Sequence, residues 1–362
     1  MRTLLGCCAL LLAFILFPAT AAADKLVLVA GGGQGGDGST AKDFKFVEPF
    51  GVAFDKAGNL YVAELSGQRV LKIDGKGVVT TVAGTLQKKG YEGDGGPAAQ
   101  ALFNGPHSIV IAPNDDMYIA DTWNSCVRKI DAKTGVVSTV AGNSTGKKGF
   151  AGDGGPATKA QFGNIYHASL DPKGERLYLA DLDNRRIRMV QLDTGIVTTV
   201  AGNGGKGVPA DGAVAKEAPL VDPRAVVADA KGNVWVLERG GHALRVVDPA
   251  GKIRTVAGTG KAGGSGDGGD AKQATLNGPK HLCVDLDGNI IIADAESNLV
   301  RKYVVADGKI LRVAGTGTKG AAGLDGPPEK AGVARPHGVT VHPSGVLYIT
   351  DSYNHRIVRI EK

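Results

Sequence analysis

Three histidines recur at one place in a repeating pattern, and imidazole rings gathered in this way could bind a metal. His107 and His337 each follow a proline directly, and His167 takes the corresponding place after Tyr166. Histidine nitrogens are common ligands of zinc and of other divalent transition metals. If the fold brings these positions together, they could form a metal site with zinc as the candidate cofactor.

The other members of this set favour a different ligand. The same place in the remaining repeats holds Phe50, Arg224 and Lys280. The two cations would oppose a metal ion but attract an anionic substrate. Trp123 lies two residues after the acid Asp121, where an aromatic ring could stack on a ligand. The sequence therefore predicts a ligand-binding set of Phe50, Trp123, Arg224 and Lys280.

These positions are set by an internal repeat that covers almost the whole chain. The tripeptide Val-Ala-Gly occurs six times, at intervals of 53 to 60 residues. A glycine-rich stretch with an Asp-Gly pair follows each copy, and then a segment that begins at a proline, or at Tyr166 in the third copy. Fifteen residues beyond that position lies an acid: Glu64, Asp121, Asp181, Glu238, Asp294 or Asp351. A spacing that holds in six copies indicates one structural unit used six times.

Each unit has the pattern of four short strands and no comparable helical period. In the first unit, strand-forming residues fall in four runs, 51–54, 59–63, 69–73 and 78–82. Four antiparallel strands repeated around an axis form the blades of a β-propeller. The last unit ends without its fourth strand, and residues 25–29 look like that strand. The sequence predicts an all-β, six-bladed propeller over 24–362, closed when the N-terminal strand completes the last blade.

The pattern resembles the NHL repeat of six-bladed propellers. The likeness is carried by Pro336-His337-Gly338-Val339, by Tyr348-Ile349-Thr350-Asp351 and by Asn354-His355-Arg356-Ile357. Two linkers with the sequence Gly-Asp-Gly-Gly-Pro-Ala strengthen it. NHL propellers include scaffolds, sensor domains and enzymes, so the resemblance implies the fold and leaves the function open.

The histidine positions are also similar to those of peptidylglycine amidating lyase, a related propeller that carries its zinc ligands on Pro-His dipeptides. This resemblance implies catalytic roles for Tyr353, two residues after Asp351, and for Arg239, directly after Glu238. Tyr353 would abstract a proton with the help of a metal, and Arg239 would hold a carboxylate through two hydrogen bonds. The lyase takes its histidines from alternate blades, whereas these come from the second, third and sixth repeats.

The repeated acids and glycines are expected to be structural. An acid present in all six units suits a turn that needs a hydrogen-bond acceptor better than it suits one calcium site. Glycine accounts for 55 of the 362 residues, and most glycines lie in the linkers, which should share one face of the disc. Lysines in these linkers would make that face positive and attractive to an anionic ligand or to a protein partner of unknown identity.

Composition and the N-terminal sequence narrow the class of protein. The net charge is +6, but no basic block with interleaved aromatic residues is present, so no nucleic-acid partner is expected. Residues 1–23 have the basic, apolar and small-residue order of a secretory signal. No further apolar run is long enough to span a bilayer. We expect an exported protein, periplasmic or extracellular, in which Cys126 and Cys283 are buried thiols, although export would allow them to oxidise.

Two functions therefore stay open. The first is a binding module that holds a ligand or a protein on its linker face, which the near-equivalence of the six blades favours. The second is a metal-dependent lyase or hydrolase that uses His107, His167 and His337, assisted by Tyr353 and Arg239.

Overall fold

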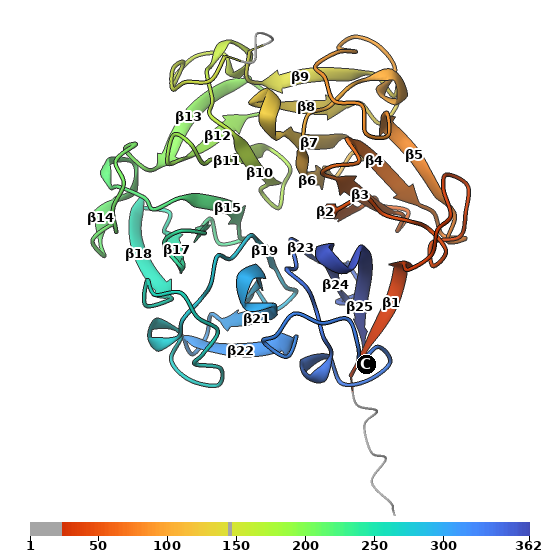
Figure 1. The fold of residues 1–362 in the computed structure, drawn as a ribbon. Coiled ribbons are helices and arrows are strands. Elements are labelled where there is room, and N and C mark those ends of the chain that lie inside the picture. Colours follow the sequence, from red (N-terminus) through yellow and green to blue (C-terminus); the bar gives the residue numbers. More distant parts are fainter. Residues whose placement is uncertain (1–23, 144–146) are drawn as a thin grey trace, which may run out of the picture.

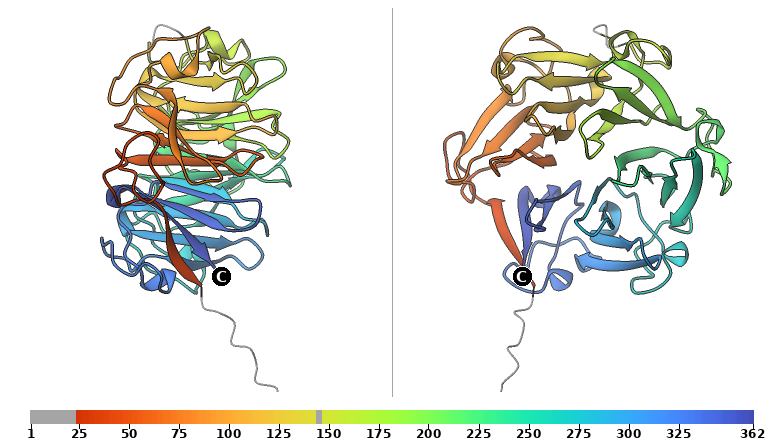
Figure 2. Two further views of the ribbon diagram at one scale, coloured as in Figure 1. Left: turned by 90° about the vertical axis from the view of Figure 1, so that its right-hand side faces the viewer. Right: turned by 180° about the vertical axis from the view of Figure 1, so that it is seen from behind.

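The computed structural model describes residues 24–143 and 147–362, and the predicted signal at 1–23 lies outside them. Strands of this part of the chain form six blades around one axis (Figure 1). Within each blade the strands cross a flat disc from one face to the other (Figure 2). None of the described helices is long and apolar enough to cross a bilayer.

The first three blades are antiparallel sheets whose first strand lies nearest the axis. Blade one consists of β2 (Pro49–Phe54), β3 (Leu60–Glu64), β4 (Arg69–Ile73) and β5 (Val79–Gly84). Blade two consists of β6 (Pro106–Ile111), β7 (Met117–Asp121), β8 (Cys126–Ile130) and β9 (Val137–Ala141). Blade three consists of β10 (Ile165–Leu170), β11 (Arg176–Asp181), β12 (Arg186–Gln191) and β13 (Ile196–Ala201).

The last three blades repeat this order with two variations. Blade four contains β15 (Pro223–Ala228), β16 (Val234–Glu238), β17 (Ala243–Val247) and β18 (Lys252–Ala257), and gains a fifth strand, β14 (Ala213–Val214), at its outer edge. Blade five contains β19 (His281–Val284), β20 (Ile290–Asp294), β21 (Leu299–Val304) and β22 (Lys309–Ala314). Blade six contains β23 (Gly338–Val341), β24 (Leu347–Asp351) and β25 (Arg356–Glu361), and β1 (Lys25–Gly31) completes it.

The pairing of β1 with β25 closes the ring, as predicted. The register runs antiparallel from Lys25 opposite Glu361 to Gly31 opposite Arg356. This pairing covers edges of both terminal strands that would otherwise offer free backbone groups to other chains.

Single turns of 3-10 helix occur at two kinds of place. Those in the linkers are η1 (Ala98–Gln100), η3 (Ala157–Lys159), η4 (Ala215–Glu217), η5 (Ala271–Gln273) and η7 (Pro328–Lys330). Those after a second strand are η2 (Thr122–Asn124), η6 (Ala295–Ser297) and η8 (Ser352–Asn354).

Apolar side chains pack between the blades. The described residues form six apolar clusters, one at each junction between neighbouring blades. Between blades one and two, Val70 packs with Ile119 and with Phe103 of the linker. Leu26 of β1 belongs to the cluster that also contains Val300 of blade five. Burying each of these aliphatic side chains stabilises the folded state by about 1.5–3 kcal/mol. Every junction between blades, including the one that closes the ring, is therefore stabilised by apolar packing.

The acid that ends the second strand of each blade is buried and ties two segments together. One carboxylate oxygen accepts a hydrogen bond, at 2.6–2.8 Å, from the backbone N–H of Val47, Asn104, Gly163, Val221, Asn277 or Ala334. Each donor lies two residues before the start of the inner strand or its proline. The other oxygen pairs with an arginine of the third strand: Glu64–Arg69 at 2.6 Å, Asp121–Arg128 at 3.6 Å, Asp181–Arg188 at 4.0 Å, Glu238–Arg245 at 2.6 Å, Asp294–Arg301 at 3.5 Å and Asp351–Arg356 at 2.7 Å. We call this arrangement the acid–arginine clamp, and it confirms the structural role predicted for the acids.

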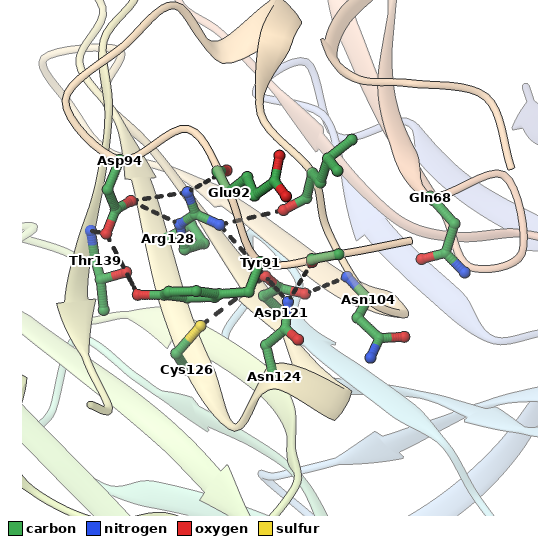
Figure 3. Close-up of polar contacts among 12 residues, drawn as sticks. Gln68, Tyr91, Glu92, Asp94, Asn104, Asp121, Asn124, Cys126, Arg128 and Thr139 are labelled. Carbon is green, nitrogen blue, oxygen red and sulfur yellow. Dashed lines mark hydrogen bonds and ion pairs between the residues drawn. The ribbon is translucent and has the colours of Figure 1, made fainter. Parts of the chain in front are cut away.

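Blade two shows how the clamp reaches the linker (Figure 3). Arg128 lies between Asp121 and the linker acid Asp94, at 2.7 Å from the latter. It also donates hydrogen bonds to the backbone oxygens of Leu102 and Glu92. The same blade contains Cys126, one of the two cysteines among the described residues, and both it and Cys283 are free thiols.

One inner strand departs from the constant spacing of the sequence. β10 pairs Ile165 with Asp181, at the register where other blades pair their proline with the acid. In blade three the acid therefore lies sixteen residues after this position instead of fifteen, because the first hairpin of the blade is longer by one residue. The prediction that gave His167 the same position in its blade as His107 and His337 have in theirs is wrong by one residue. Tyr166 takes the place that His107 takes in blade two, and His167 lies one residue further into the disc.

Removing one member of a clamp should destabilise the ring strongly. Arg128→Leu leaves the buried carboxylate of Asp121 without its cation, and loss of one partner from a buried pair costs about 3–5 kcal/mol. Arg359→Leu breaks the exposed pair with Glu361 and should cost less than about 1 kcal/mol. Chemical denaturation of both variants measures the contrast. Equal losses would show that the buried clamp adds nothing beyond a surface pair.

Candidate functional site

The inner strands bring six side chains together where the linkers meet the axis. These residues, which we call the mouth ring, are Phe50, His107, Tyr166, Arg224, Lys280 and His337. Five of them form a continuous series of contacts. The ring of Phe50 stacks on His337 at 4.1 Å between centroids and meets His107 edge-on at 5.3 Å. The ring centroids of His107 and Tyr166 are 4.7 Å apart. The guanidinium carbon of Arg224 lies over the ring of Tyr166, 4.3 Å from its centroid.

The two histidines of the mouth ring have a fixed orientation. The Nδ1–H of His107 donates to the backbone oxygen of Gly105 at 2.9 Å, and that of His337 donates to Arg335 at 2.7 Å. A backbone oxygen can only accept, so each neutral ring keeps its lone pair on Nε2. Neither Nε2 has a hydrogen-bond partner among the described residues. Both nitrogens are therefore available to accept a hydrogen bond from a ligand.

Arg224 is a buried cation without an anionic partner. Arg224 is 5% exposed. Its Nη1 donates a long hydrogen bond, 3.4 Å, to the backbone oxygen of Tyr166. Among residues 24–143 and 147–362, Nε has no hydrogen-bond partner and no carboxylate lies within 4.0 Å. Burial lowers the pKa of Arg224 to about 9, which still leaves it charged at neutral pH.

The neighbouring cations are neutralised, which sets Arg224 apart. Lys280 pairs with Glu296 at 3.0 Å, and Arg239 pairs with Asp222 at 2.7 Å. The role predicted for Arg239, to hold a carboxylate of a ligand, would require it to exchange Asp222 for that ligand. Arg224 needs no such exchange.

Two exposed aromatic rings border the mouth ring. Trp123 is 41% exposed and meets His107 at 5.6 Å between ring centroids. Tyr353 is 38% exposed, stacks near His337 at 5.8 Å and accepts a hydrogen bond from Arg335 at 2.8 Å. The structure thus brings the predicted Phe50, Trp123, Tyr353, Arg224 and Lys280 to one surface, together with Tyr166, which the sequence reasoning missed because of the extra residue in blade three.

A second pair of histidines lies one layer deeper along the axis. The Nε2 atoms of His167 and His281 are 2.9 Å apart, and both rings are buried. His281 was not predicted, although it directly follows Lys280. Its position could have been found only with the register of β19, which places it level with His167.

The predicted metal ligands do not form one centre. His107 and His337 donate their Nδ1–H to backbone oxygens, as metal-binding histidines do. His167, however, is turned toward His281 in the deeper layer, and Phe50 contacts both of the other two rings. Among the described residues, no group of three or more His, Cys, Asp or Glu is arranged to hold a metal ion. The set His107, His167 and His337 does not fit a three-histidine site, and we derive no reaction step through a metal.

A surface cavity lies elsewhere on the molecule. It has a volume of about 650 Å³ and is bounded by residues that include Asp24, Leu286 and Leu311. None of the predicted site residues lines it, so we place the candidate site where the charged and aromatic groups converge.

Comparison with known proteins identifies the repeat. Residues 103–130 and 334–360 match the NHL repeat family, and residues 157–263 match the Teneurin NHL domain. The chain carries NHL repeats. This NHL propeller is 30% identical, over 290 residues, to Protein SUPPRESSOR OF QUENCHING 1, chloroplastic, of Arabidopsis thaliana, covering 76% of this chain and 27% of that protein. It is 29% identical, over 312 residues, to NHL repeat-containing protein 2 of Gallus gallus, covering 76% and 42%. The chain therefore spans less than half the length of these relatives.

A solved structure shares the fold. An auxiliary nutrient binding protein from Bacteroides thetaiotaomicron superposes with a TM-score of 0.68 at 15% identity, covering 93% of this NHL propeller and 76% of that chain. At this identity the likeness shows the fold alone.

His107, His281 and His337 should stay neutral at pH values well below the usual pKa of imidazole. Burial first, and then the charge of Arg224, lower the pKa of His107 and His337, and the same two causes lower that of His281 to about 3. Unfolding lets these rings take up protons below about pH 6.5, so each one should lower the free energy of unfolding as the pH falls.

This pH dependence can be measured at one ring. Between pH 6.5 and 5.5 one such histidine accounts for about 1 kcal/mol. Replacement His337→Phe should therefore flatten the pH dependence of the unfolding free energy by that amount, and the comparison cancels all other titrations. An NMR titration in which His337 takes up a proton near pH 6.5 would contradict this assignment.

Proposed function

We propose that the protein is an exported binding module that takes an anionic ligand at the mouth ring. The observation that carries this proposal is Arg224, a buried guanidinium with no carboxylate partner in the described chain. Burying a charge without a partner is costly, and such groups are found where a ligand completes the site. Export rests on the signal predicted at residues 1–23.

The surroundings of Arg224 favour a particular kind of anion. A guanidinium offers parallel N–H groups that match a carboxylate or a phosphate. The Nε2 lone pairs of His107 and His337 would accept hydrogen bonds from a donor on the same ligand. Phe50, Trp123 and Tyr353 offer ring faces and edges to a flat apolar part. The ligand that fits best is an organic acid with an unsaturated ring and a hydrogen-bond donor.

Positive charge beside the mouth ring supports an anionic ligand or an acidic protein partner. The fold neighbour from Bacteroides is named an auxiliary nutrient binding protein. Lys319 lies 5.7 Å from the ring of Tyr353 and adds positive charge at the rim. A protein partner that presents an acidic side chain at the mouth ring would use the same contacts.

The alternative prediction, a metal-dependent lyase or hydrolase, has weaker support. It would need a third ligand beside His107 and His337, and the described residues offer no such group. Metal analysis of the purified protein checks it. Stoichiometric zinc that is lost on replacing His107 and His337 would favour the enzyme.

Calorimetric titration with 4-hydroxyphenylacetate tests the proposal, because this probe combines a carboxylate, a ring and a hydroxyl donor. The carboxylate should bind, and its neutral amide should bind at least tenfold more weakly. Arg224→Met should weaken carboxylate binding about tenfold to a hundredfold, since a charge-assisted hydrogen bond contributes about 1.5–3 kcal/mol.

The matched control is Lys173→Met, which removes an exposed lysine from the hairpin between β10 and β11, away from the mouth ring. It should bind the carboxylate as the parent protein does. Equal binding of acid and amide, an Arg224→Met variant with unchanged affinity, or a carboxylate that does not bind would each contradict the proposal.

A further inference from the structure

The charged members of the mouth ring come from neighbouring blades. Its members from blades one to three are the aromatic rings of Phe50, His107 and Tyr166. Its members from blades four and five are Arg224 and Lys280, which are both buried. The mouth ring thus has an aromatic side and a cationic side, and a ligand that contacts both needs a flat part and an anionic part.

Two further arginines add charge to the cationic side. Arg239 directly follows β16 of blade four, and Arg335 lies two residues before the ring member of blade six. These cations are close enough to repel one another: burial lowers the pKa of Lys280, and the nearby charges of Arg224 and Arg239 lower it further. Three neighbouring blades therefore bring four cations to one side of the axis.

Glu296 is shared by two of these cations. Its Oε1 lies 3.0 Å from the Nζ of Lys280, and the Nη2 of Arg335 contacts the same oxygen. Burial raises the pKa of Glu296, but the hydrogen bonds from Arg335 and Lys280 hold it below its usual value, so the carboxylate is charged. One negative charge is thus divided between two positive charges.

Asp222 has the corresponding role in blade four. Its Oδ2 lies 2.7 Å from the Nε of Arg239. Burial lowers the pKa of Arg224, and Asp222 raises it only from a distance, because no ion pair joins the two side chains. Four cations and two carboxylates leave two positive charges in excess. One of them belongs to Arg224, and the other is shared by Lys280 and Arg335.

Each excess charge is accompanied by an N–H group without a partner. The Nε atoms of Arg224 and Arg335 are both buried and have no hydrogen-bond partner among the described residues. The other nitrogens of Arg335 donate to Glu296 and, at 2.8 Å, to the hydroxyl of Tyr353. An unbalanced charge and a buried donor without an acceptor are both unfavourable, and one anionic group relieves both. Two separate places on the cationic side therefore suit an anionic group.

We propose that the mouth ring takes a dicarboxylate whose two acid groups are held apart by one flat ring. One carboxylate binds Arg224, and the other binds Lys280 and Arg335. The flat ring lies against Phe50 and His107 on the aromatic side. A monocarboxylate would leave one of the two excess charges unbalanced. This inference rests on the proposed function, since it names the class of ligand for the same site.

Calorimetric titration with 5-hydroxyisophthalate and with its monoamide, 3-carbamoyl-5-hydroxybenzoate, tests the inference. Both probes have the ring, the hydroxyl donor and at least one carboxylate, and they differ only in the charge of the second acid group. The dicarboxylate should bind about fivefold to tenfold more tightly, because its second carboxylate meets two cations in a partly exposed place. Added salt should reduce this difference.

Two variants change the excess charge in opposite directions. Arg335→Met removes one positive charge and leaves Glu296 to Lys280 alone, so the preference for the dicarboxylate should fall to about twofold or less. Glu296→Gln keeps the shape of the side chain but removes the shared negative charge, so the preference should rise by at least about twofold. Lys173→Met should keep the preference of the parent protein.

These titrations separate the inference from the proposed function. If both probes bind the parent protein equally and Arg224→Met weakens both, the proposed function is supported and the second carboxylate site is overturned. A preference for the dicarboxylate that Arg335→Met does not reduce, or that Glu296→Gln does not raise, would also overturn this site. If neither probe binds the parent protein, the proposed function and the inference are both contradicted.

Discussion

In every blade, one buried carboxylate at the end of the second strand accepts a backbone N–H from ahead of the inner strand and pairs with an arginine of the third strand. The two bonds use the two oxygens of the same group, so they fix three segments against each other. The start of each inner strand is thereby set relative to the sheet behind it. Because the mouth ring lies at these starts, the clamp determines where its six side chains lie.

The clamp also explains why function concentrates on so few residues. The charged residues that repeat in all blades pair with one another inside the fold, as Asp121 and Arg128 do. The charges at the mouth ring do not repeat: Lys280 is paired with Glu296, and the neighbouring Arg239, outside the ring, is paired with Asp222. Among the residues that the structure describes, Arg224 is left without a carboxylate partner. In a ring of nearly equivalent blades, this one buried cation breaks the symmetry, and a ligand of opposite charge would complete it.

The sequence was sufficient to predict the fold and most of the residues that form the mouth ring. Six copies of one pattern predicted the blades, and the orphan strand at residues 25–29 predicted their closure, because both depend on local strand patterns and spacing. The exact register of the inner strand in blade three could not be predicted from it. A single extra residue in the hairpin of blade three moved His167 one layer down and put Tyr166 in its place, and constant spacing cannot reveal such an insertion. The pairing of His167 with His281 joins residues more than a hundred positions apart, across an axis that only the closed ring creates.

The central claim is that Arg224 has no carboxylate partner among the described residues and is held in place for a ligand. The free energy of unfolding of the Arg224→Met variant, measured without ligand, tests it most directly. An apolar side chain of similar length removes an uncompensated buried charge, so the variant should be more stable than the parent, by about 1–3 kcal/mol. A variant that is less stable than the parent would contradict the account, since it would mean that the fold itself depends on the guanidinium.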